Sequence, residues 1–345
     1  MASSGFMLSA TDQGARENNL NFLRLVAASL VTLSHAWPLT GSVGEPLAHL
    51  TGVLTFGAVA VHVFFAISGF LIAKSFDRSD GLWRFLKARA LRLYPGLFVA
   101  LVLSVLLIQL LAGSLSHGEY FLHPATRAYI KNNLLLNTQY ELPGIFLGNH
   151  FPGSVNGSLW TLRYEVAMYL MVTLCGLLGL IRRPFWFNLL SMPLVGGIIV
   201  AALTMHKPFG NIPDDAIVMA VCFYLGTAMY VNRQHVLLDL RLAAALWLVT
   251  YLAKGSLYFH PLYSVALSYS VLLAGFLPRL QSSALSLRND YSYGIYIYSF
   301  PVQQLLVHFQ PQLGPWTHFG LAYLIALPFA VASWHLVEKP ALKMK

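Results

Sequence analysis

Ten apolar stretches run through this sequence, and they limit what the chain can fold into. A helix needs about 20 mostly apolar residues to cross the hydrocarbon core of a bilayer. The stretches comprise residues 21–40, 54–76, 93–113, 158–181, 187–204, 215–232, 241–253, 261–279, 291–309 and 318–336. The seventh is the shortest. The sequence therefore predicts an all-α, polytopic membrane protein with about ten transmembrane helices.

The composition excludes a soluble protein, because only 10% of the 345 residues are charged and soluble domains carry about 25%. Residues 1–19 are polar and lack the basic segment and apolar core of a cleavable signal peptide, so we expect the first helix to insert and stay. Cys175 and Cys222 lie inside apolar stretches without a CxxC spacing. We expect them to be packing residues rather than a disulfide or a metal site.

The basic residues predict an orientation. If the N-terminus faces the cytoplasm, 17 Lys and Arg fall in inner segments and only four in outer loops. The inner set is Arg16, Arg24, Lys74, Arg78, Arg84, Lys87, Arg89, Arg92, Arg182, Arg183, Arg233, Arg241, Arg279, Arg288, Lys339, Lys343 and Lys345, and the outer set is Arg127, Lys131, Lys207 and Lys254. The positive-inside rule then places both termini in the cytoplasm. This asymmetry explains the net charge of +9 without a nucleic-acid partner.

One connection is much longer than the others. Residues 114–157 form a long outer connection, of which 129–137 is a candidate short interfacial helix. Long ordered loops tend to be functional. With no internal repeat and no linker, residues 1–345 are expected to form a single transmembrane domain that ends in a short cytoplasmic tail, 337–345.

The first apolar stretch, FLRLVAASLVTLSHAW, contains Arg24 and His35. Eleven residues at 100° each exceed three full turns by only about 20°, so both side chains project from one helix face, about 16 Å apart along the axis. Ionisable residues inside a membrane usually face a protein interior or a water-filled path. The alternative is an arginine that snorkels to the inner interface and a histidine bonded to a neighbouring helix. The shared face favours a functional pair.

A basic cluster precedes the third apolar stretch. WRFLKARALRLYP places Lys87, Arg89 and Arg92 at its cytoplasmic end, and the two arginines, three residues apart, share a helix face. Topological anchoring alone predicts basic residues here. The same guanidinium groups would also hold the phosphates of a nucleotide.

A third polar cluster opens the fourth apolar stretch, in NGSLWTLRYEVAMY. Ser158 is a candidate N-cap, and Glu165 lies about 10 Å deeper by helix rise, a depth similar to that of His35. A carboxylate beside an imidazole fixes its tautomer and stabilises the imidazolium, as a general base requires. The alternative is a structural ion pair of Glu165.

Other polar residues carry weaker indications. Ser68 and Gly69 are small residues that allow close helix approach. The histidines lack zinc-ligand spacing, so we expect no metal. We expect Glu338 to pair with the basic cytoplasmic end rather than to take part in chemistry.

Six segments together resemble the acyltransferase-3 family of integral-membrane acyltransferases, which O-acetylate bacterial surface glycans. They are FLRLVAASLVTLSHAW, VHVFFAISGFLIAKSF, FLKARALRLYP, NGSLWTLRYEVAMYL, SYGIYIYSFPVQQ and VEKP. The resemblance implies that Arg24 and His35 are essential and that His35 is the catalytic base. We expect the stand-alone form, without the C-terminal SGNH-type domain that some members carry.

The resemblance also assigns the substrate-binding residues. It implies that Arg89, Arg92 and Tyr94, with Lys87 beside them, bind the acyl-CoA donor. It matches Ser158, Trp160 and Glu165 to a Ser-Leu-Trp motif and its following glutamate, and we expect Trp160, Asn156 and Ser158 to contact the acceptor.

The sequence thus predicts a multi-pass acyltransferase (EC 2.3.1.-) of the bacterial inner membrane. Acetyl-CoA is the expected donor co-substrate, no cofactor is bound tightly, and the acceptor is a carbohydrate or glycolipid such as lipopolysaccharide O-antigen or exopolysaccharide. His35, oriented by Glu165, would deprotonate the acceptor hydroxyl, and an acyl-histidine intermediate is an open alternative. Two alternatives come from other functional classes. One is a transporter or flippase of a glycolipid or polysaccharide precursor, and the other is a structural subunit of an export complex.

Overall fold

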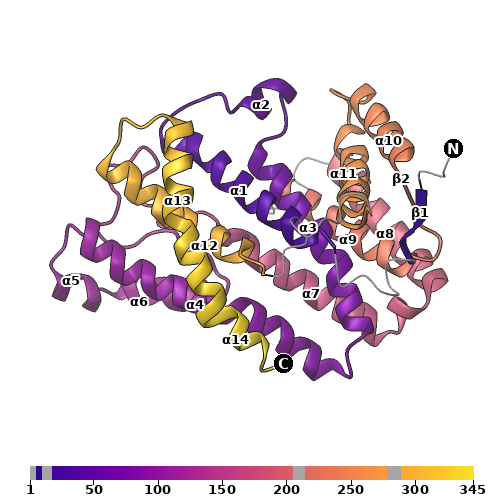
Figure 1. Cartoon of the computed structure of the whole chain (residues 1–345), viewed down its shortest axis with the longest axis horizontal. Coiled ribbons are helices and arrows are strands. Elements are labelled where there is room, and N and C mark those ends of the chain that lie inside the picture. Colours follow the sequence, from indigo (N-terminus) through magenta and orange to yellow (C-terminus); the bar gives the residue numbers. More distant parts are fainter. Residues whose placement is uncertain (1–4, 10–17, 205–213, 278–288) are drawn as a thin grey trace. The chain divides into compact units, whose positions relative to one another are not determined.

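The computed structural model describes residues 5–9, 18–204, 214–277 and 289–345, which are mainly helical with very little sheet (Figure 1). Seven helices in this part of the chain are long and apolar enough to cross a membrane. They are Leu20–Leu39, Phe56–Asp77, Leu82–Ala112, Pro184–Ala201, Asp214–Val231, Phe259–Phe276 and Pro315–Leu342. The predicted all-α, polytopic membrane fold is confirmed.

Each of the ten predicted spans coincides with a helix, although three fall outside the seven. The seventh, 241–253, is the shorter apolar helix Leu240–Leu252. The fourth corresponds to Leu162–Leu177, of 16 residues, and the ninth to Ser292–Phe309. The ninth carries polar residues such as Gln303, Gln304 and His308, which lower its hydropathy. The number of spans and the cytoplasmic location of the termini stay predictions. Arg16, Lys207, Arg279 and Arg288, which contribute to the charge count, lie outside the described residues.

The chain forms two compact units, each assembled from three separate stretches, and each is described by itself. Unit 1 comprises residues 1–24, 61–85 and 164–288, and unit 2 comprises 25–60, 86–163 and 289–345. Unit 1 contains β1 (Gly5–Met7), the start of α1 (Leu20–Leu39), most of α3 (Phe56–Asp77), most of α7 (Leu162–Leu177), η3 (Leu180–Arg182), α8 (Pro184–Thr204), α9 (Asp214–Val231), β2 (Leu237–Asp239), α10 (Leu240–Leu252) and α11 (Phe259–Phe276). Unit 2 contains the rest of α1, α2 (Pro46–Thr51), most of α4 (Leu82–Ala112), α5 (His117–Leu122), α6 (Pro124–Leu134), η2 (Leu159–Thr161), α12 (Ser292–Phe309), α13 (Pro315–Ser333), the π-helix η5 (Trp334–Glu338) and α14 (Lys339–Leu342).

Small residues bring helices together in unit 1, as predicted for Gly69. A Cβ atom at Gly69 of α3 would lie 2.0 Å from the backbone oxygen of Phe223 in α9, and one at Gly226 of α9 would lie 2.1 Å from that of Ala66. Only glycine permits this approach, because a Cβ atom would overlap the facing backbone. Such close contacts stabilise lipid-embedded helices, which associate through packing. Cys175, which is half-buried, and Cys222, which is buried, are free thiols in unit 1, and their packing role stays a prediction.

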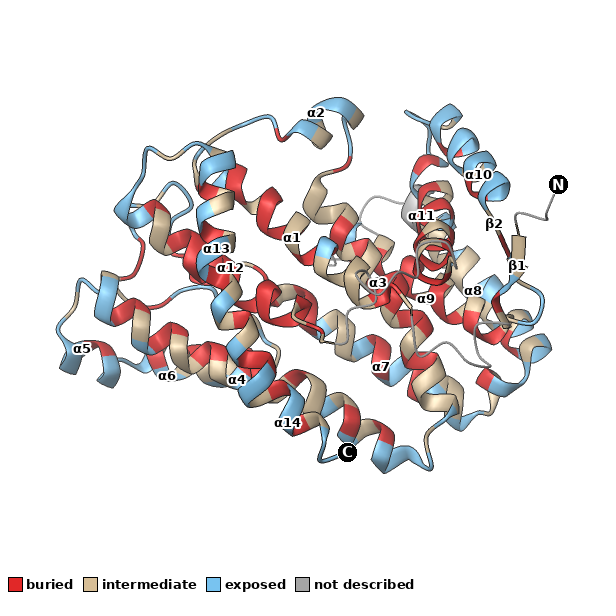
Figure 2. Cartoon of the chain, viewed as in Figure 1, coloured by how far each residue is buried: buried red, intermediate tan, exposed pale blue. Residues whose placement is uncertain are grey.

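Helix α12 forms the centre of unit 2, and most of its residues are buried (Figure 2). It packs along α13, where a Cβ atom at Gly294 would lie 2.6 Å from Cα of Ala330. The residues of α12 therefore contact other helices and loops on most sides, which provides partners for the polar side chains of this predicted span.

Helix α4 begins at Leu82, eleven residues before the apolar stretch predicted from 93, and contains Pro95. Backbone hydrogen bonding does not require apolar side chains, so the helix includes the basic residues that precede the stretch. Its 31 residues span about 46 Å, more than the hydrocarbon thickness of about 30 Å.

The outer connection 114–157 contains two helices, α5 and α6, instead of the single helix expected at 129–137. Ser116 and Glu119 form a capping box at the start of α5. The connection is tied to α4, because the Tyr120 hydroxyl donates to the Val105 carbonyl at 3.2 Å. The connection is thus an ordered part of unit 2.

Candidate active site

His35 lies near the C-terminal end of α1, and its ring meets the edge of the Phe300 ring of α12 at 5.0 Å between centroids. Its Nδ1 atom is buried and has no hydrogen-bond partner among the described residues. Buried polar atoms are nearly always paired, so an unpaired one requires an explanation. A histidine retained only for packing would be expected to have a partner.

His35 forms part of the wall of a cavity of about 420 Å³ inside unit 2. The other lining residues come from α1, the outer connection, η2 and α12, and are Pro38, Leu39, Tyr140, Glu141, Phe151, Pro152, Ser154, Gly157, Trp160 and Phe300. The cavity combines aromatic rings with a carboxylate and hydroxyl groups. Aromatic surfaces with a few polar groups are typical of small-molecule sites.

Gly157 lets the outer connection approach α12 at this cavity. A Cβ atom at position 157 would lie 2.5 Å from the Phe300 ring, too close for any other residue without a shift of that ring. Phe300 in turn contacts both His35 and Phe151. A side chain at Gly157 would therefore disturb the wall around His35.

Of the three predicted acceptor-binding residues, only Trp160 lines the cavity. Asn156 is buried, and its amide donates to the Ile297 carbonyl of α12 at 2.9 Å and accepts from the Ser158 backbone N–H. Ser158 occupies the N-cap position of η2, but its hydroxyl makes no capping bond, so the predicted side-chain cap is wrong. The reason is that the backbone at Ser158 is itself helical, whereas a capping serine has an extended backbone. Contact of Asn156 and Ser158 with the acceptor stays a prediction.

Arg24 and Glu165 belong to unit 1. The Arg24 guanidinium lies 6.0 Å from the centre of the Phe64 ring of α3. Glu165, in the first turn of α7, accepts a hydrogen bond from the Tyr169 hydroxyl at 2.5 Å. The predicted pairing of Glu165 with His35 and the shared role of Arg24 and His35 stay predictions.

Two consecutive glutamines of α12, both fully buried, bond to two different segments that contribute to the cavity. The Gln303 amide donates to the Thr32 carbonyl of α1 at 2.9 Å, one turn before His35. The Gln304 amide donates to the carbonyls of Phe151 and Ser154, which line the cavity, at 2.8 and 2.7 Å. The glutamine pair thus fixes α1 and the outer connection relative to α12.

The basic cluster lies in the N-terminal part of α4, and its arginines differ in their surroundings. Arg92 pairs with Asp290 at 2.5 Å and with Glu338 at 3.3 Å, and all three side chains are at most 14% exposed. Its guanidinium also lies 5.7 Å from the ring centres of Tyr293 and Trp334. The expected pairing of Glu338 with the basic end is therefore confirmed, and Arg92 is balanced by two carboxylates.

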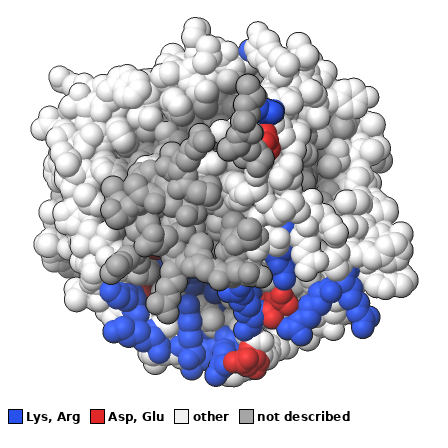
Figure 3. Space-filling model, turned by 45° about the vertical axis from the view of Figure 1, so that its right-hand side comes forward, with Lys and Arg blue, Asp and Glu red and all other residues white. Residues whose placement is uncertain are grey.

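Lys87 is exposed, whereas Arg89 and Tyr94 are half-buried. Burial, and then the positive charges of Arg89 and Arg92, hold the pKa of Lys345 below its usual value, so these cations lie close together. Basic side chains gather along one edge of the face shown in Figure 3, with a few acidic ones among them. In the described part of the chain, no group of three or more His, Cys, Asp or Glu side chains could hold a metal ion.

Comparison with known proteins identifies the family. A family model described as an acyltransferase domain, that of acyltransferase-3, matches residues 17–335. The chain belongs to the acyltransferase-3 family. It is therefore a membrane acyltransferase, and the predicted family and enzyme class are confirmed.

Relatives of this acyltransferase include proteins of similar length. It is 30% identical to the O-acetyl transferase of Shigella phage Sf6 over 334 residues, which cover 94% of this chain and 96% of the relative. It is also 30% identical to Nodulation protein 10 of Rhizobium leguminosarum bv. viciae over 363 residues, 95% of this chain and 94% of the relative. The Acyltransferase MdmB of Streptomyces mycarofaciens is 29% identical over 43% of this chain and 32% of its own length. No solved structure matches the chain.

Sequence reasoning missed several residues of the acyltransferase that the structure brings to His35. Phe300, Glu141 and Ser154 line the same cavity. Phe300 belongs to the family segment SYGIYIYSFPVQQ, although that segment assigns it no role, and nothing in the local sequence marks Glu141 and Ser154. Gln303 and Gln304 were detectable, because two adjacent amides in an apolar stretch must find buried partners. Asp290 lies just before α12, and 198 positions in the sequence separate it from its partner Arg92.

Proposed function

We propose that this acyltransferase is an O-acetyltransferase of the bacterial inner membrane, which transfers an acetyl group from cytoplasmic acetyl-CoA to a hydroxyl of an exported carbohydrate. The observation that carries the proposal is the position of His35 on the wall of a 420 Å³ cavity, with a buried Nδ1 atom that lacks a partner among the described residues. The name of the phage relative supports transfer of acetyl to oxygen.

The cavity residues suit a carbohydrate acceptor. Trp160 and Tyr140 offer aromatic surface against which a sugar ring can pack, and Glu141 and Ser154 offer hydrogen-bonding oxygens. These groups would hold one sugar hydroxyl close to the imidazole, and such positioning supplies a large part of the rate enhancement in group transfer.

In the proposed reaction, an imidazole nitrogen of His35 removes the proton from the sugar hydroxyl. At the same time the hydroxyl oxygen attacks the carbonyl carbon of the thioester. A C–O bond forms, and the C–S bond breaks as the tetrahedral intermediate collapses. The coenzyme A thiolate leaves and takes the proton from the imidazolium. The products are the O-acetyl sugar and coenzyme A, and His35 returns to its initial state.

The donor would bind at the basic end of unit 2. Arg89 lies close to Lys345 there, and the exposed Lys87 precedes Arg89 by two residues in α4. Guanidinium groups form charge-assisted hydrogen bonds with phosphates. Arg92 is committed to Asp290 and Glu338, so we assign it to holding this end of α4 in place rather than to the phosphates.

The proposal can be tested with the full chain in lipid nanodiscs, radiolabelled acetyl-CoA and fragments of lipopolysaccharide and exopolysaccharide. We expect labelled glycan from the wild type and a loss of at least about 10²-fold in His35→Ala, the magnitude typical of a general base. His117→Ala is the matched control, because His117 is exposed on α5. If His35→Ala retains most of the activity at equal abundance, His35 is not the base.

A further inference from the structure

The cavity around His35 is lined by one acidic side chain and by no basic one. Among the described residues that form its wall, Glu141 carries the single carboxylate, and no lysine or arginine is present. The two cations of the outer connection, Arg127 and Lys131, lie on α6 and do not line the cavity. With His35 in the neutral form that acts as a base, the cavity therefore carries a negative charge.

The Glu141 carboxylate is available to a ligand. It is exposed and makes no ion pair or hydrogen bond with the described residues. The other four acidic residues of unit 2 all have partners. Glu45 and Glu119 accept hydrogen bonds from neighbouring hydroxyl and backbone groups, and Asp290 and Glu338 share an arginine. Glu141 is thus the acidic residue of unit 2 whose charge is not used within the fold.

The backbone that carries Glu141 is held on both sides. The Gln139 side-chain amide donates to the Ala125 carbonyl of α6 at 3.2 Å and to the Glu141 carbonyl at 3.3 Å. The Val155 backbone N–H donates to the Tyr140 carbonyl at 2.8 Å. A charge on a fixed segment cannot move away from a like charge on a ligand, so it discriminates better than a charge on a mobile loop.

Aromatic rings surround this carboxylate in the cavity. Tyr140, which is 40% exposed, Phe151 and Trp160 all contribute to the lining. Such rings can pack against the C–H face of a sugar, whose hydroxyl groups then need hydrogen-bond partners. Walls of low dielectric also strengthen the field of a charge inside a cleft. A sugar with a carboxylate of its own would meet this field with no cation beside it.

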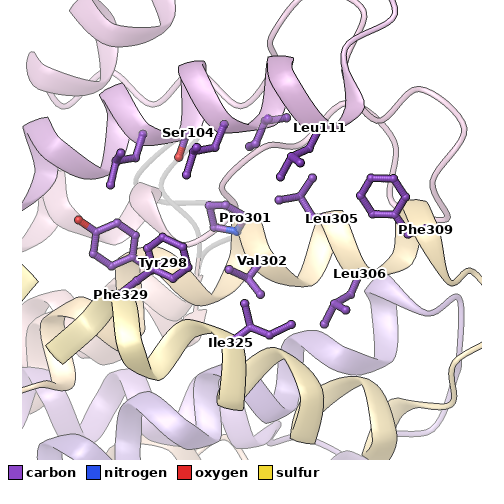
Figure 4. Close-up of a pocket in the computed structure, with 13 residues that line it drawn as sticks. Ser104, Leu111, Tyr298, Pro301, Val302, Leu305, Leu306, Phe309, Ile325 and Phe329 are labelled. Atoms are coloured by element: carbon purple, nitrogen blue, oxygen red, sulfur yellow. The ribbon is translucent and has the colours of Figure 1, made fainter. Parts of the chain in front are cut away.

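A second hollow in unit 2 offers no comparable groups. It lies between α4, α12 and α13, and side chains such as Leu111, Pro301 and Ile325 line it (Figure 4). Apart from the hydroxyl groups of Ser104 and Tyr298, its lining is hydrocarbon. A sugar would find few hydrogen-bond partners there, so we place the acceptor sugar in the His35 cavity.

We propose that the sugar which receives the acetyl group is uncharged, and that Glu141 is the residue that selects it. The Glu141 carboxylate accepts hydrogen bonds from hydroxyl groups of a neutral sugar, and it repels the carboxylate of a hexuronate or a sialic acid. Specificity of this kind comes from an unfavourable contact with the wrong ligand as well as from a favourable one with the right ligand. This inference rests on the proposed acetyl transfer, because it narrows the acceptor class of the same cavity.

Matched oligosaccharides test the proposal on the full chain in nanodiscs. Their terminal sugar is glucose or galactose, the corresponding uronate, or the methyl ester of that uronate, so the members of a set differ only at C6. The dissociation constant is measured by ligand-observed NMR without acetyl-CoA, which separates binding from turnover. The kcat/KM for each oligosaccharide is then measured with acetyl-CoA.

In the wild type, we expect the neutral sugars to bind at least about tenfold more tightly than the uronates, because like charges at close range are strongly unfavourable. The methyl esters should bind about as well as the neutral sugars. The discrimination should shrink in 1 M salt, since mobile ions screen an exposed carboxylate. These three results need no variant, so they do not depend on how a variant folds.

The variants then assign the selectivity to one residue. Glu141→Gln keeps the size of the side chain and removes its charge, so the ratio between neutral sugar and uronate should fall to about one. Glu141→Lys should reverse the preference. Glu119→Gln is the matched control, because Glu119 is exposed in the same connection and a glutamine preserves the capping box of α5.

Four results would overturn the proposal: uronates that bind as tightly as the neutral sugars, methyl esters that bind as weakly as the uronates, an unchanged ratio in both Glu141 variants, or no binding of any oligosaccharide. Weak binding of the methyl esters would mean that size rather than charge is selected. If the neutral sugars bind selectively and none is acetylated, the proposed acetyl transfer fails and the selectivity of the cavity stands.

Discussion

The side-chain amide of Gln303 in α12 donates a hydrogen bond of 2.9 Å to the backbone carbonyl of Thr32 in α1. Thr32 precedes His35 by three residues, so this bond fixes the helical turn that carries the imidazole. The His318 ring of α13 is bonded in turn to the Gln303 carbonyl at 3.0 Å. Three helices are thus linked through buried polar groups next to the candidate base.

Gln303→Met should lower kcat by about 10- to 10²-fold, because a small misplacement of the His35 imidazole has a cost of this order. The KM values for acetyl-CoA and for the glycan should be unchanged. The methionine fills the same space without an N–H donor. Stability should change little, since interhelical hydrogen bonds in membranes average about 0.6 kcal/mol. Steady-state kinetics and thermal melting would measure both quantities. Gln310→Met, at the exposed end of α12, is the control, and a wild-type kcat in Gln303→Met would show that the bond has no role in positioning His35.

Arg92→Met should destabilise the protein by about 3–5 kcal/mol, because the buried carboxylates of Asp290 and Glu338 would both lose the guanidinium that pairs with them. The triple variant Arg92→Met, Asp290→Asn, Glu338→Gln should recover much of this loss, since no uncompensated charge is left. Thermal unfolding in detergent, followed by size-exclusion chromatography, gives the comparison. A stable Arg92→Met enzyme with a raised KM for acetyl-CoA would instead make Arg92 a ligand of the donor.

Arg89→Ala should raise the KM for acetyl-CoA by about one to two decades, because hydrogen bonds to charged groups contribute about 1.5–3 kcal/mol. The kcat at saturating donor should stay close to that of the wild type. Arg84→Ala is a suitable control, since Arg84 forms an exposed pair with Asp80 in the same helix region. If Arg89→Ala and Arg84→Ala have the same KM for acetyl-CoA, Arg89 does not bind the donor and acts only in membrane orientation.

The predicted orientation can be tested by cysteine labelling in intact cells, in a background without Cys175 and Cys222. Val43→Cys should react with a membrane-impermeant maleimide, and Asp80→Cys should react only after the cells are opened. Val43 is 94% exposed, whereas Glu45 is buried and accepts hydrogen bonds from Ser34 and the Phe56 backbone, so position 45 is unsuitable. Labelling at position 80 alone would reverse the orientation. A label at position 210 would lie outside the described residues.

The sequence by itself determined the class of fold and most of its elements. Apolar stretches of about 20 residues can be satisfied only as helices in a bilayer, because every backbone polar group there needs an internal partner. All ten stretches coincide with helices, and the small residue Gly69 does mark a close helix approach. The family motifs also identified the chain as an acyltransferase, since their order along the chain does not depend on packing.

The tertiary structure decided which of these residues meet. Hydrophobic periodicity constrains one helix at a time, so it could not reveal that Phe300 and Glu141 share a cavity with His35 or that Asp290 neutralises Arg92. It also could not separate Trp160, which faces the cavity, from Asn156, which is bonded to the α12 backbone. The physical reason is that partners hundreds of residues apart are selected by packing and by the need to pair every buried polar group, and both depend on how the helices are assembled.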